Sequence, residues 1–132
     1  MFLSSLEMTK LLHAISYYEG FDPPSEKNDW LGSVAWRNKN PGTLRSSIFE
    51  SGKRDGFAFF QNDITGYFAL QYDIMQKAKG NTITKLNCES TIVDLIEVYA
   101  PRNDRNDTDS YIKFVLDFTR FSPDYKLKNL LK

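Results

Sequence analysis

The sequence is poor in cysteine and histidine, and this excludes several kinds of chemistry. Its single cysteine, Cys88, has no partner for an internal disulfide, so packing alone must stabilise the fold. Its single histidine, His13, falls inside a predicted helix, which argues against a catalytic site built from serine or cysteine with histidine. We expect Cys88 to be a small buried or half-buried residue and His13 to serve packing or the surface.

No charge of one sign dominates, and no long apolar run occurs. Seventeen basic residues balance seventeen acidic residues, so no net field favours nucleic acid or an anionic membrane. No stretch approaches the roughly 18 uninterrupted apolar residues of a membrane span. The first residues lack a basic segment ahead of an apolar one. We therefore expect that the chain has no signal peptide and is made in the cytoplasm. A target outside the cytoplasm would have to be reached by another delivery route.

Sequence patterns for metals and nucleotides are also missing. The acidic run from Asp104 to Asp109 lacks the glycine and the distal glutamate of a calcium loop. It is more typical of a solvated segment that caps a helix. No glycine-rich phosphate loop occurs, and we expect no metal and no cofactor.

The chain does contain enough apolar residues for one core. With 132 residues, 41% of them hydrophobic, it fits a single domain over residues 1–132, which we expect to be a monomer. Apolar residues at three- and four-residue spacing predict four helices. These run from Ser4 or Ser5 to about Glu19, from Ile64 to about Lys79 after an Asp63 cap, from Ser90 to Tyr99, and from an Asp107 or Thr108 cap past Leu116. Short helical pieces are expected within residues 25–36 and after Pro123, and residues 81–89 fit a strand or a helical turn equally well.

Two short strand-like runs predict a small hairpin. The turn-forming residues 38–42 lead into Thr43–Arg45, and Phe57–Phe60 follows the polar stretch 50–56. Together with the helices, this indicates a predominantly helical α+β domain.

Glu19 is the candidate catalytic residue because of its position. It stands at the expected end of the first helix, beside Tyr17, Tyr18 and Phe21, so its carboxyl is expected to be partly removed from water. Such burial raises the pKa of a carboxyl and keeps it protonated as a general acid near neutral pH. Position alone is weak support, because a glutamate at a helix end is usually a solvated surface charge.

Four motifs in a fixed order strengthen this hypothesis. The segments YYEGF, RNKNPGTLR, GFAFFQNDITGYFAL and YAPRNDRNDTDSYIKFV resemble a family of small lysozyme-like, transglycosylase-type domains of bacteriophage and bacterial genomes. The resemblance covers about residues 13–125. It implies the fold of lysozyme, in which a helical body and a small β element flank a groove for the sugar chain.

The same resemblance implies roles for particular residues. Glu19 is the implied catalytic acid and base. Across the cleft from it, the implied lining residues are Asn38, Asn40, Pro41, Gly42, Thr43 and Arg45. A third motif maps onto Asn106, Asp107 and Thr108, with Tyr111 one helical turn further on, where its phenol could reach the sugar or orient Glu19. The sequence departs from the family pattern at Thr43, where asparagine is usual, and at Arg105, where glutamate is usual.

Several of these residues also have a purely structural interpretation. Asn-Pro-Gly forms a turn in any protein, and Asn106 to Thr108 can simply cap the helix that follows. Trp30 and Trp36 can stack on sugars or pack in the core.

The expected function is cleavage of the glycan strand of peptidoglycan. A muramidase needs a second carboxylate near Glu19, for which the candidates are Asp22, Glu50, Asp55 and Asp63. A lytic transglycosylase needs only Glu19, acting first as acid and then as base, and the resemblance favours this route. The alternative function is a lysozyme-like module that binds peptidoglycan or a protein partner in a virion or secretion apparatus without turnover.

Overall fold

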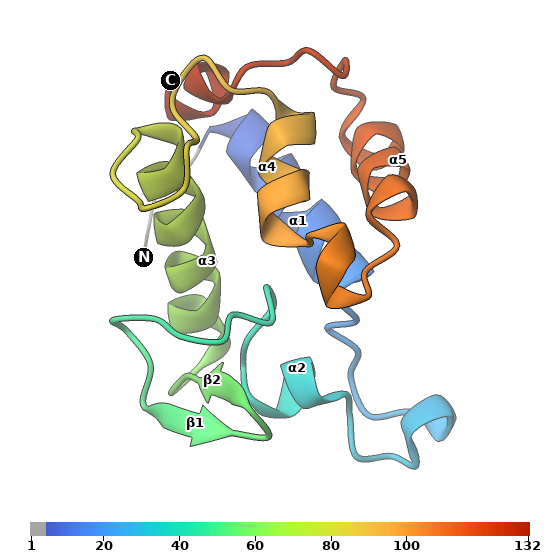
Figure 1. Cartoon of the computed structure of the whole chain (residues 1–132). Coiled ribbons are helices and arrows are strands. Elements are labelled where there is room, and N and C mark those ends of the chain that lie inside the picture. Colours follow the sequence, from blue (N-terminus) through green and yellow to red (C-terminus); the bar gives the residue numbers. More distant parts are fainter. Residues whose placement is uncertain (1–4) are drawn as a thin grey trace. The chain divides into compact units, whose positions relative to one another are not determined.

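The computed structural model describes residues 5–132, and their contacts group them into two compact units. Unit 1 contains residues 15–73, and unit 2 contains residues 5–14 and 74–132. The division falls within helix α1 (Leu6–Tyr18) and within helix α3 (Asp63–Ala78). The class is α+β, as predicted, with helices and one two-stranded antiparallel hairpin (Figure 1). A single domain over residues 1–132 stays a prediction.

Unit 1 holds the hairpin and the short helices. Its elements are η1 (Glu26–Asn28), α2 (Val34–Arg37), β1 (Gly52–Arg54), β2 (Phe57–Phe59) and the first part of α3. The strands pair with Gly52 opposite Phe59. Its core is apolar, and the fully or almost fully buried side chains include Ile15, Ala35, Ala58, Phe60 and Leu70.

The first strand of the hairpin was predicted in the wrong place. Thr43 has φ +46°, a left-handed conformation that does not fit a strand, so Thr43–Arg45 is irregular. The strand β1 lies instead in the polar stretch that was taken for a connection. Asp55 and Gly56 follow it with φ of +56° and +83°, the pair of positive values that a tight two-residue hairpin turn requires.

Unit 2 is built from helices around a second apolar core. Its complete elements are α4 (Ile92–Tyr99), η2 (Arg102–Asp104), α5 (Thr108–Thr119) and η3 (Leu127–Leu131), and α4 packs on α5. Thr91 caps α4 by accepting a hydrogen bond from the Asp94 N–H at 3.1 Å. The helix predicted from Ser90 to Tyr99 begins two residues later and ends where expected, and the helix predicted after an Asp107 or Thr108 cap is confirmed.

Of the other predictions about the elements, the Ser5 cap is confirmed and several need correction. Ser5 caps α1 by accepting from the Met8 N–H at 3.1 Å, whereas Ser4 lies outside the described residues. The cap of α3 is Asn62, whose Oδ1 accepts from the Thr65 N–H at 2.8 Å, and not Asp63. Residues 81–89 contain neither helix nor strand, and the last helical piece begins only at Leu127. Cys88 is exposed, because its polar neighbours form a turn at the surface.

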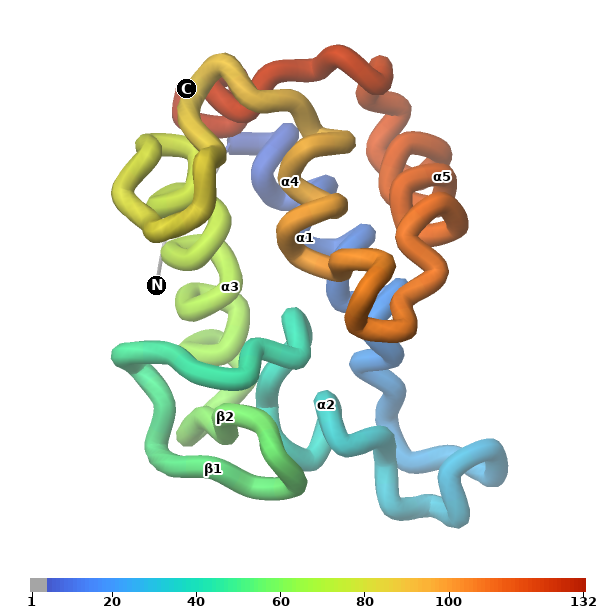
Figure 2. Tube along the Cα trace, viewed as in Figure 1, coloured from blue at the N-terminus to red at the C-terminus, as the bar shows by residue number. Residues whose placement is uncertain are grey.

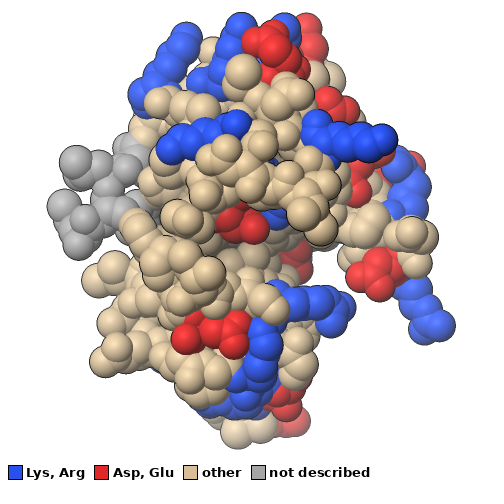
Figure 3. All heavy atoms as spheres, turned by 60° about the vertical axis from the view of Figure 1, so that its left-hand side comes forward, with Lys and Arg blue, Asp and Glu red and all other residues tan. Residues whose placement is uncertain are grey.

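Charges of both signs are spread over the surface. On the face drawn in Figure 3, acidic and basic side chains are intermixed and large areas are uncharged. Within residues 5–132, no helix combines the length and the apolar character that crossing a membrane requires. The same residues contain no group of three or more histidine, cysteine, aspartate or glutamate side chains placed to hold a metal ion.

Gly66 allows α3 to approach the turn that precedes the hairpin. A Cβ atom on Gly66 would stand 1.9 Å from the carbonyl oxygen of Lys39 and 2.9 Å from Cδ of Pro41. Both are atoms of the backbone or of a rigid ring, so they cannot swing aside as a flexible side chain can. The position of the turn over residues 38–43 therefore depends on a glycine in α3.

Gly66→Ala is expected to lower the free energy of unfolding by at least about 2 kcal/mol, although alanine favours helix, because the turn must shift. Gly56→Ala is the matched control, since Gly56 has φ +83° but nothing within 4 Å of its Cβ position. The control should cost only about 1 kcal/mol, for conformational reasons. Urea unfolding measures both, and equal losses would show that the close approach does not hold the turn.

Candidate functional site

Glu19 has a fixed backbone position at the C-terminal end of α1. Its N–H donates to the Ile15 carbonyl at 2.8 Å, and Gly20 follows with φ +75°. The Phe21 N–H then donates to the Ser16 carbonyl at 3.0 Å, a bond that closes a helix end of this type. The predicted end of the helix before the glycine is confirmed, and the half-buried Glu19 side chain leaves the helix from a rigid point.

Aromatic packing anchors the segment that follows Glu19. The ring centroid of Phe21 lies 5.1 Å from that of Trp36 and 5.8 Å from that of Tyr67. The Tyr67 hydroxyl donates to Oγ of Ser16 at 3.2 Å, and burial raises the pKa of Tyr67. Trp36 therefore takes the packing role that the sequence left open.

Thr43 makes a direct hydrogen bond to the candidate acid. Its hydroxyl donates to Oε1 of Glu19 at 2.8 Å. The left-handed φ of +46° is unusual for a β-branched residue and costs on the order of 1–3 kcal/mol. Asparagine tolerates this conformation far better than threonine does. Thr43 thus combines a strained backbone with a hydroxyl that contacts Glu19.

Glu19 and Thr43 open onto a cavity of about 130 Å³ in unit 1. Four segments supply its walls: the end of α1, the helix α2 with its cap, the turn after α2, and β2. The lining residues are Glu19, Gly20, Ser33, Val34, Ala35, Asn38, Asn40, Thr43 and Phe57. Four of the predicted site residues are therefore brought together. The walls from α2 and β2 were not predicted from the sequence. Ser33 could have indicated α2, because serine is a common capping residue and its Oγ accepts from the Trp36 N–H at 3.1 Å.

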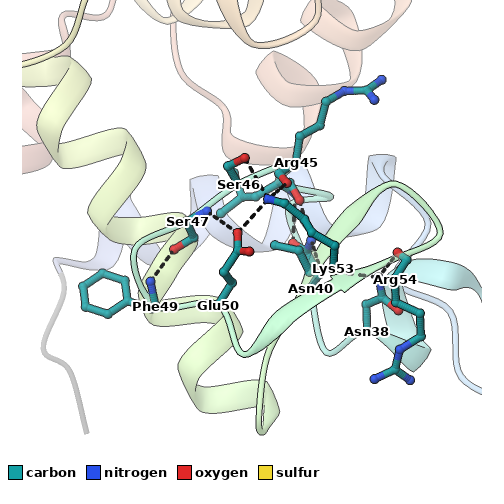
Figure 4. A network of polar contacts seen from close by, with 11 residues as sticks. Asn38, Asn40, Arg45, Ser46, Ser47, Phe49, Glu50, Lys53 and Arg54 are labelled. Carbon is teal, nitrogen blue, oxygen red and sulfur yellow. Dashed lines mark hydrogen bonds and ion pairs between the residues drawn. The ribbon is translucent and has the colours of Figure 1, made fainter.

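Two buried asparagines bind the backbone of their own chain. Asn40 Nδ2 donates to the carbonyls of Leu44 and Ala58, both at 2.9 Å, and its Oδ1 accepts from the Leu44 N–H at 2.9 Å. Asn38 Nδ2 donates to the Arg54 carbonyl at 2.9 Å and to that of Ala58 at 3.4 Å (Figure 4). These bonds tie the turn to the hairpin. A substrate contact through Asn40 stays a prediction.

A lysine secures the loop between the turn and β1. Lys53 Nζ donates to the Arg45 carbonyl at 2.5 Å, to Ser46 Oγ at 2.8 Å and to Glu50 Oε1 at 2.8 Å (Figure 4). The Lys53 ammonium and then the Ser47 N–H hold the pKa of Glu50 below its usual value. The side chain of Arg45 is exposed, with its guanidinium carbon 5.2 Å from the ring centroid of Phe57 in the cavity wall. Gly42 is buried in the same turn.

The four candidates for a second carboxylate lie outside the lining of this cavity. Glu50 is bound to Lys53, and Asp55 forms an ion pair with Arg37 at 3.8 Å. Asp22 and Asp63 are exposed. Among the described residues, Glu19 is the only acidic side chain that lines the cavity.

Trp30 is presented to solvent by a loop that side-chain hydrogen bonds hold together. The Trp30 side chain is 67% exposed, and its φ of +63° is again a left-handed value. Asn28 organises the loop, because its Oδ1 accepts from the N–H groups of Ser25 at 2.9 Å and Gly32 at 3.1 Å. Figure 2 traces this loop in light blue ahead of α2. Of the two tryptophans, Trp30 is the exposed one, whereas Trp36 is half-buried.

The remaining predicted site residues belong to unit 2 and support its fold. Thr108 is buried, and its hydroxyl donates to the Ala100 carbonyl at 2.6 Å. Asn106 Nδ2 donates to the Pro101 carbonyl at 3.1 Å. Tyr111 is only 2% exposed.

The capping role proposed for this segment is confirmed at Asp107. Its Oδ1 accepts from the Ser110 N–H at 3.1 Å at the start of α5. Hydrogen bonds from the Ser110 hydroxyl and then the Ser110 N–H lower the pKa of Asp107. Contacts of Asn106, Thr108 or Tyr111 with substrate stay predictions.

Comparison of the chain with protein-family models, curated proteins and solved structures gives no match. A function must therefore be argued from the cavity of unit 1 and from the order of the sequence motifs.

Variants of Thr43 separate its hydroxyl from its strained backbone. Thr43→Ser keeps the donor and removes the branch, so its free energy of unfolding is expected to equal or exceed that of the wild type. Thr43→Val keeps the branch and loses the donor to Glu19, which is expected to cost about 1–2 kcal/mol. Urea unfolding at neutral pH measures both variants. The hydrogen bond would be unimportant if serine and valine gave the same stability.

Proposed function

We propose that this protein cleaves the glycan strand of peptidoglycan, with Glu19 as the general acid and base. The observation that carries the proposal is Glu19, the one acidic side chain in the cavity wall among residues 5–132, with the Thr43 hydroxyl at 2.8 Å. The order of the four sequence motifs points to the same residue. A lysozyme-like arrangement of the whole chain, a monomeric state and delivery to the cell wall or in a phage particle belong to this proposal.

The surroundings of Glu19 suit a carboxyl that gives up and takes back a proton. The C-terminal end of a helix carries partial negative charge, so a proton on the carboxyl of Glu19 relieves repulsion there. The Thr43 hydroxyl, in turn, stabilises the carboxylate that remains after the proton has left. Both protonation states therefore have a supporting interaction, as an acid that later acts as base requires.

The single carboxylate favours the transglycosylase route over hydrolysis. A glycosidase that uses two carboxylates needs them about 5–9.5 Å apart across the bond. In the transglycosylase route, Glu19 protonates the glycosidic oxygen as the bond between it and the anomeric carbon breaks. The Glu19 carboxylate then removes the proton of the sugar's own 6-hydroxyl, whose oxygen closes a ring on the anomeric carbon. Glu19 regains its proton, and no water is consumed.

Glu19→Gln is expected to reduce release of soluble muropeptides from purified sacculi by at least about 100-fold, since the amide cannot donate the proton. Glu26→Gln is the matched control, because Glu26 is an exposed glutamate of the same unit. Liquid chromatography with mass spectrometry measures the release and identifies anhydro ends, which the transglycosylase route predicts. An active Glu19→Gln variant would contradict the role of Glu19. Wild type that sediments with sacculi without releasing fragments would support a binding module instead.

Trp30→Ala is expected to weaken binding of a soluble chito-oligosaccharide about tenfold, because stacking on the exposed ring is lost. In the wild type, quenching of tryptophan fluorescence on titration measures this binding, and calorimetry measures it in the variant. Ile64→Ala is the control, since Ile64 is 63% exposed in the same unit. Unchanged affinity of Trp30→Ala would show that sugars do not reach this loop.

A further inference from the structure

Ile83 is the most exposed of the large apolar side chains within residues 5–132. It stands in the loop 80–87, which follows α3 and belongs to unit 2. The hydroxyls of its two neighbours, Thr82 and Thr84, form a hydrogen bond with each other at 2.6 Å. The two polar side chains are therefore turned toward each other, and the apolar side chain between them is left in solvent.

The loop 80–87 is fixed at its base. A Cβ atom on Gly80 would stand 3.6 Å from Cβ of Asn87, so the two ends of the loop lie side by side. Leu86 is 5% exposed and anchors the loop in the apolar core of its unit, and its N–H donates to Oγ1 of Thr84 at 3.4 Å. A single exposed apolar residue needs no explanation by itself, so the surroundings of Ile83 decide what it can do.

Lysines gather at the end of unit 2 that carries this loop. The last segment of the chain lies beside the loop, because the Lys128 N–H donates to the Cys88 carbonyl at 3.0 Å. Figure 1 shows the loop after α3 and this last segment at the same end of the unit. Residues 79–89 and 124–132 together contain five lysines, Lys79, Lys85, Lys126, Lys128 and Lys132, and two acidic residues, Glu89 and Asp124.

Two of these lysines neutralise one of the acids. Nζ of Lys126 donates to Oε1 of Glu89 at 2.7 Å, and Nζ of Lys128 lies 3.0 Å from Oε2 of the same carboxylate. Two ammonium groups on one carboxylate leave one positive charge in excess, and Lys79 and Lys85 are exposed on the loop side. This end of the unit is therefore positive, although the chain as a whole has no net charge.

An apolar tip among lysines fits an anionic lipid surface better than it fits a folded partner. A fluid surface accepts one apolar side chain without a pocket of matching shape, while its headgroups attract the surrounding ammonium groups. Residues 79–89 and 124–132 contain no arginine, the residue typical of fixed bidentate partners. The flexible stem of lysine can instead lie along apolar surface while its ammonium reaches water.

Two other occupants are disfavoured. A second copy of the chain would bring two lysine-rich ends together, and like charges repel each other across an interface. Nucleic acid is bound as a single strand largely by stacking of bases on aromatic rings, which Ile83 cannot provide.

We propose that the loop 80–87 of this protein binds the surface of an anionic membrane. Ile83 enters the boundary between headgroups and acyl chains, and Lys79 and Lys85 interact with negatively charged headgroups around it. Peripheral binding of this kind needs no spanning helix. The inference goes beyond the proposed function and does not depend on glycan cleavage.

Sedimentation of the full chain with lipid vesicles tests the proposal. Vesicles of phosphatidylcholine mixed with phosphatidylglycerol are expected to bind the chain at least about 25-fold more tightly than vesicles of phosphatidylcholine alone, because each of two lysines near an anionic surface contributes about a fivefold factor. Added salt is expected to weaken binding to the anionic vesicles.

Variants separate the apolar tip from the charges. Ile83→Ser is expected to weaken binding to anionic vesicles at least about fivefold, because the apolar contact is lost. Ile48→Ser is the matched control, since Ile48 is 78% exposed in unit 1. Lys85→Gln is expected to weaken the same binding about fivefold, with Lys27→Gln, an exposed lysine of unit 1, as its control. Melting temperatures check that each variant folds.

A third variant reports insertion directly. Ile83→Trp is expected to keep the binding, and its fluorescence is expected to move to shorter wavelength with anionic vesicles, beyond any change in the wild type. The wild type provides the background of Trp30 and Trp36.

Several outcomes would overturn the inference. Absence of binding to anionic vesicles does so, as do equal binding to both kinds of vesicle and an Ile83→Ser variant that binds like the wild type or like Ile48→Ser. An unmoved Ile83→Trp spectrum also overturns it. Poly-glutamate bound as tightly as the anionic vesicles would assign the lysines to an acidic protein partner instead. Each result can be obtained whether or not sacculi release muropeptides, so the inference fails or holds separately from the proposed function.

Discussion

The anchoring of the turn over residues 38–43 is the constraint on which the rest of the candidate site depends. Asn38 and Asn40 donate side-chain hydrogen bonds to backbone carbonyls of the hairpin and of Leu44, which follows the turn. The missing side chain of Gly66 allows the turn to lie against α3. Hydrogen bonds from buried amides fix a geometry more strictly than apolar contacts do, because these bonds are directional. Thr43 is therefore held where its hydroxyl meets Glu19.

The same anchoring explains how a strained conformation persists at Thr43. A positive φ at a β-branched residue survives only where the surroundings determine the backbone on both sides. Asn40 does this by accepting from the Leu44 N–H and donating to the Leu44 carbonyl, while the Thr43 N–H donates to the Asn40 carbonyl at 3.1 Å. Strain of this kind is concentrated at functional sites, where geometry is worth more than stability.

Sequence patterns predicted the helices well and the hairpin less well, for physical reasons. Helical periodicity in the sequence indicates that one face of the helix is buried, and the end of α1 at Gly20 follows from local backbone geometry. The helices and this helix end could therefore be predicted from the sequence. The strand β1 is only three residues long and polar, so it carries no burial pattern. The one local signal for β1 was Asp55-Gly56, a dipeptide typical of tight hairpin turns. This dipeptide is better evidence for the position of the hairpin than the strand-like composition of Thr43–Arg45.

The candidate site shows the same division between local and non-local information. The position of Glu19 at a helix end follows from neighbouring residues, and the sequence sufficed for it. The hydrogen bonds of Asn38 and Asn40 differ, because Asn38 Oδ1 has no partner within residues 5–132 while the Asn40 amide bonds on both sides. These bonds go to the carbonyls of Arg54 and Ala58, which lie far along the chain, and no sequence pattern predicts such partners.

Asn38 and Asn40 belong to the same turn motif but have different hydrogen-bond partners. An Asn-x-Asn turn suggests two equivalent ligands for a sugar, yet the Asn40 amide is used by the fold on both its donor and its acceptor side. The Asn38 amide forms hydrogen bonds through its donor Nδ2 alone, and its buried Oδ1 has no hydrogen-bond partner within residues 5–132. A buried acceptor without a partner costs stability. The two asparagines therefore act mainly on the fold, and the polar groups of the wall on which the proposed chemistry depends are the carboxyl of Glu19 and the hydroxyl of Thr43.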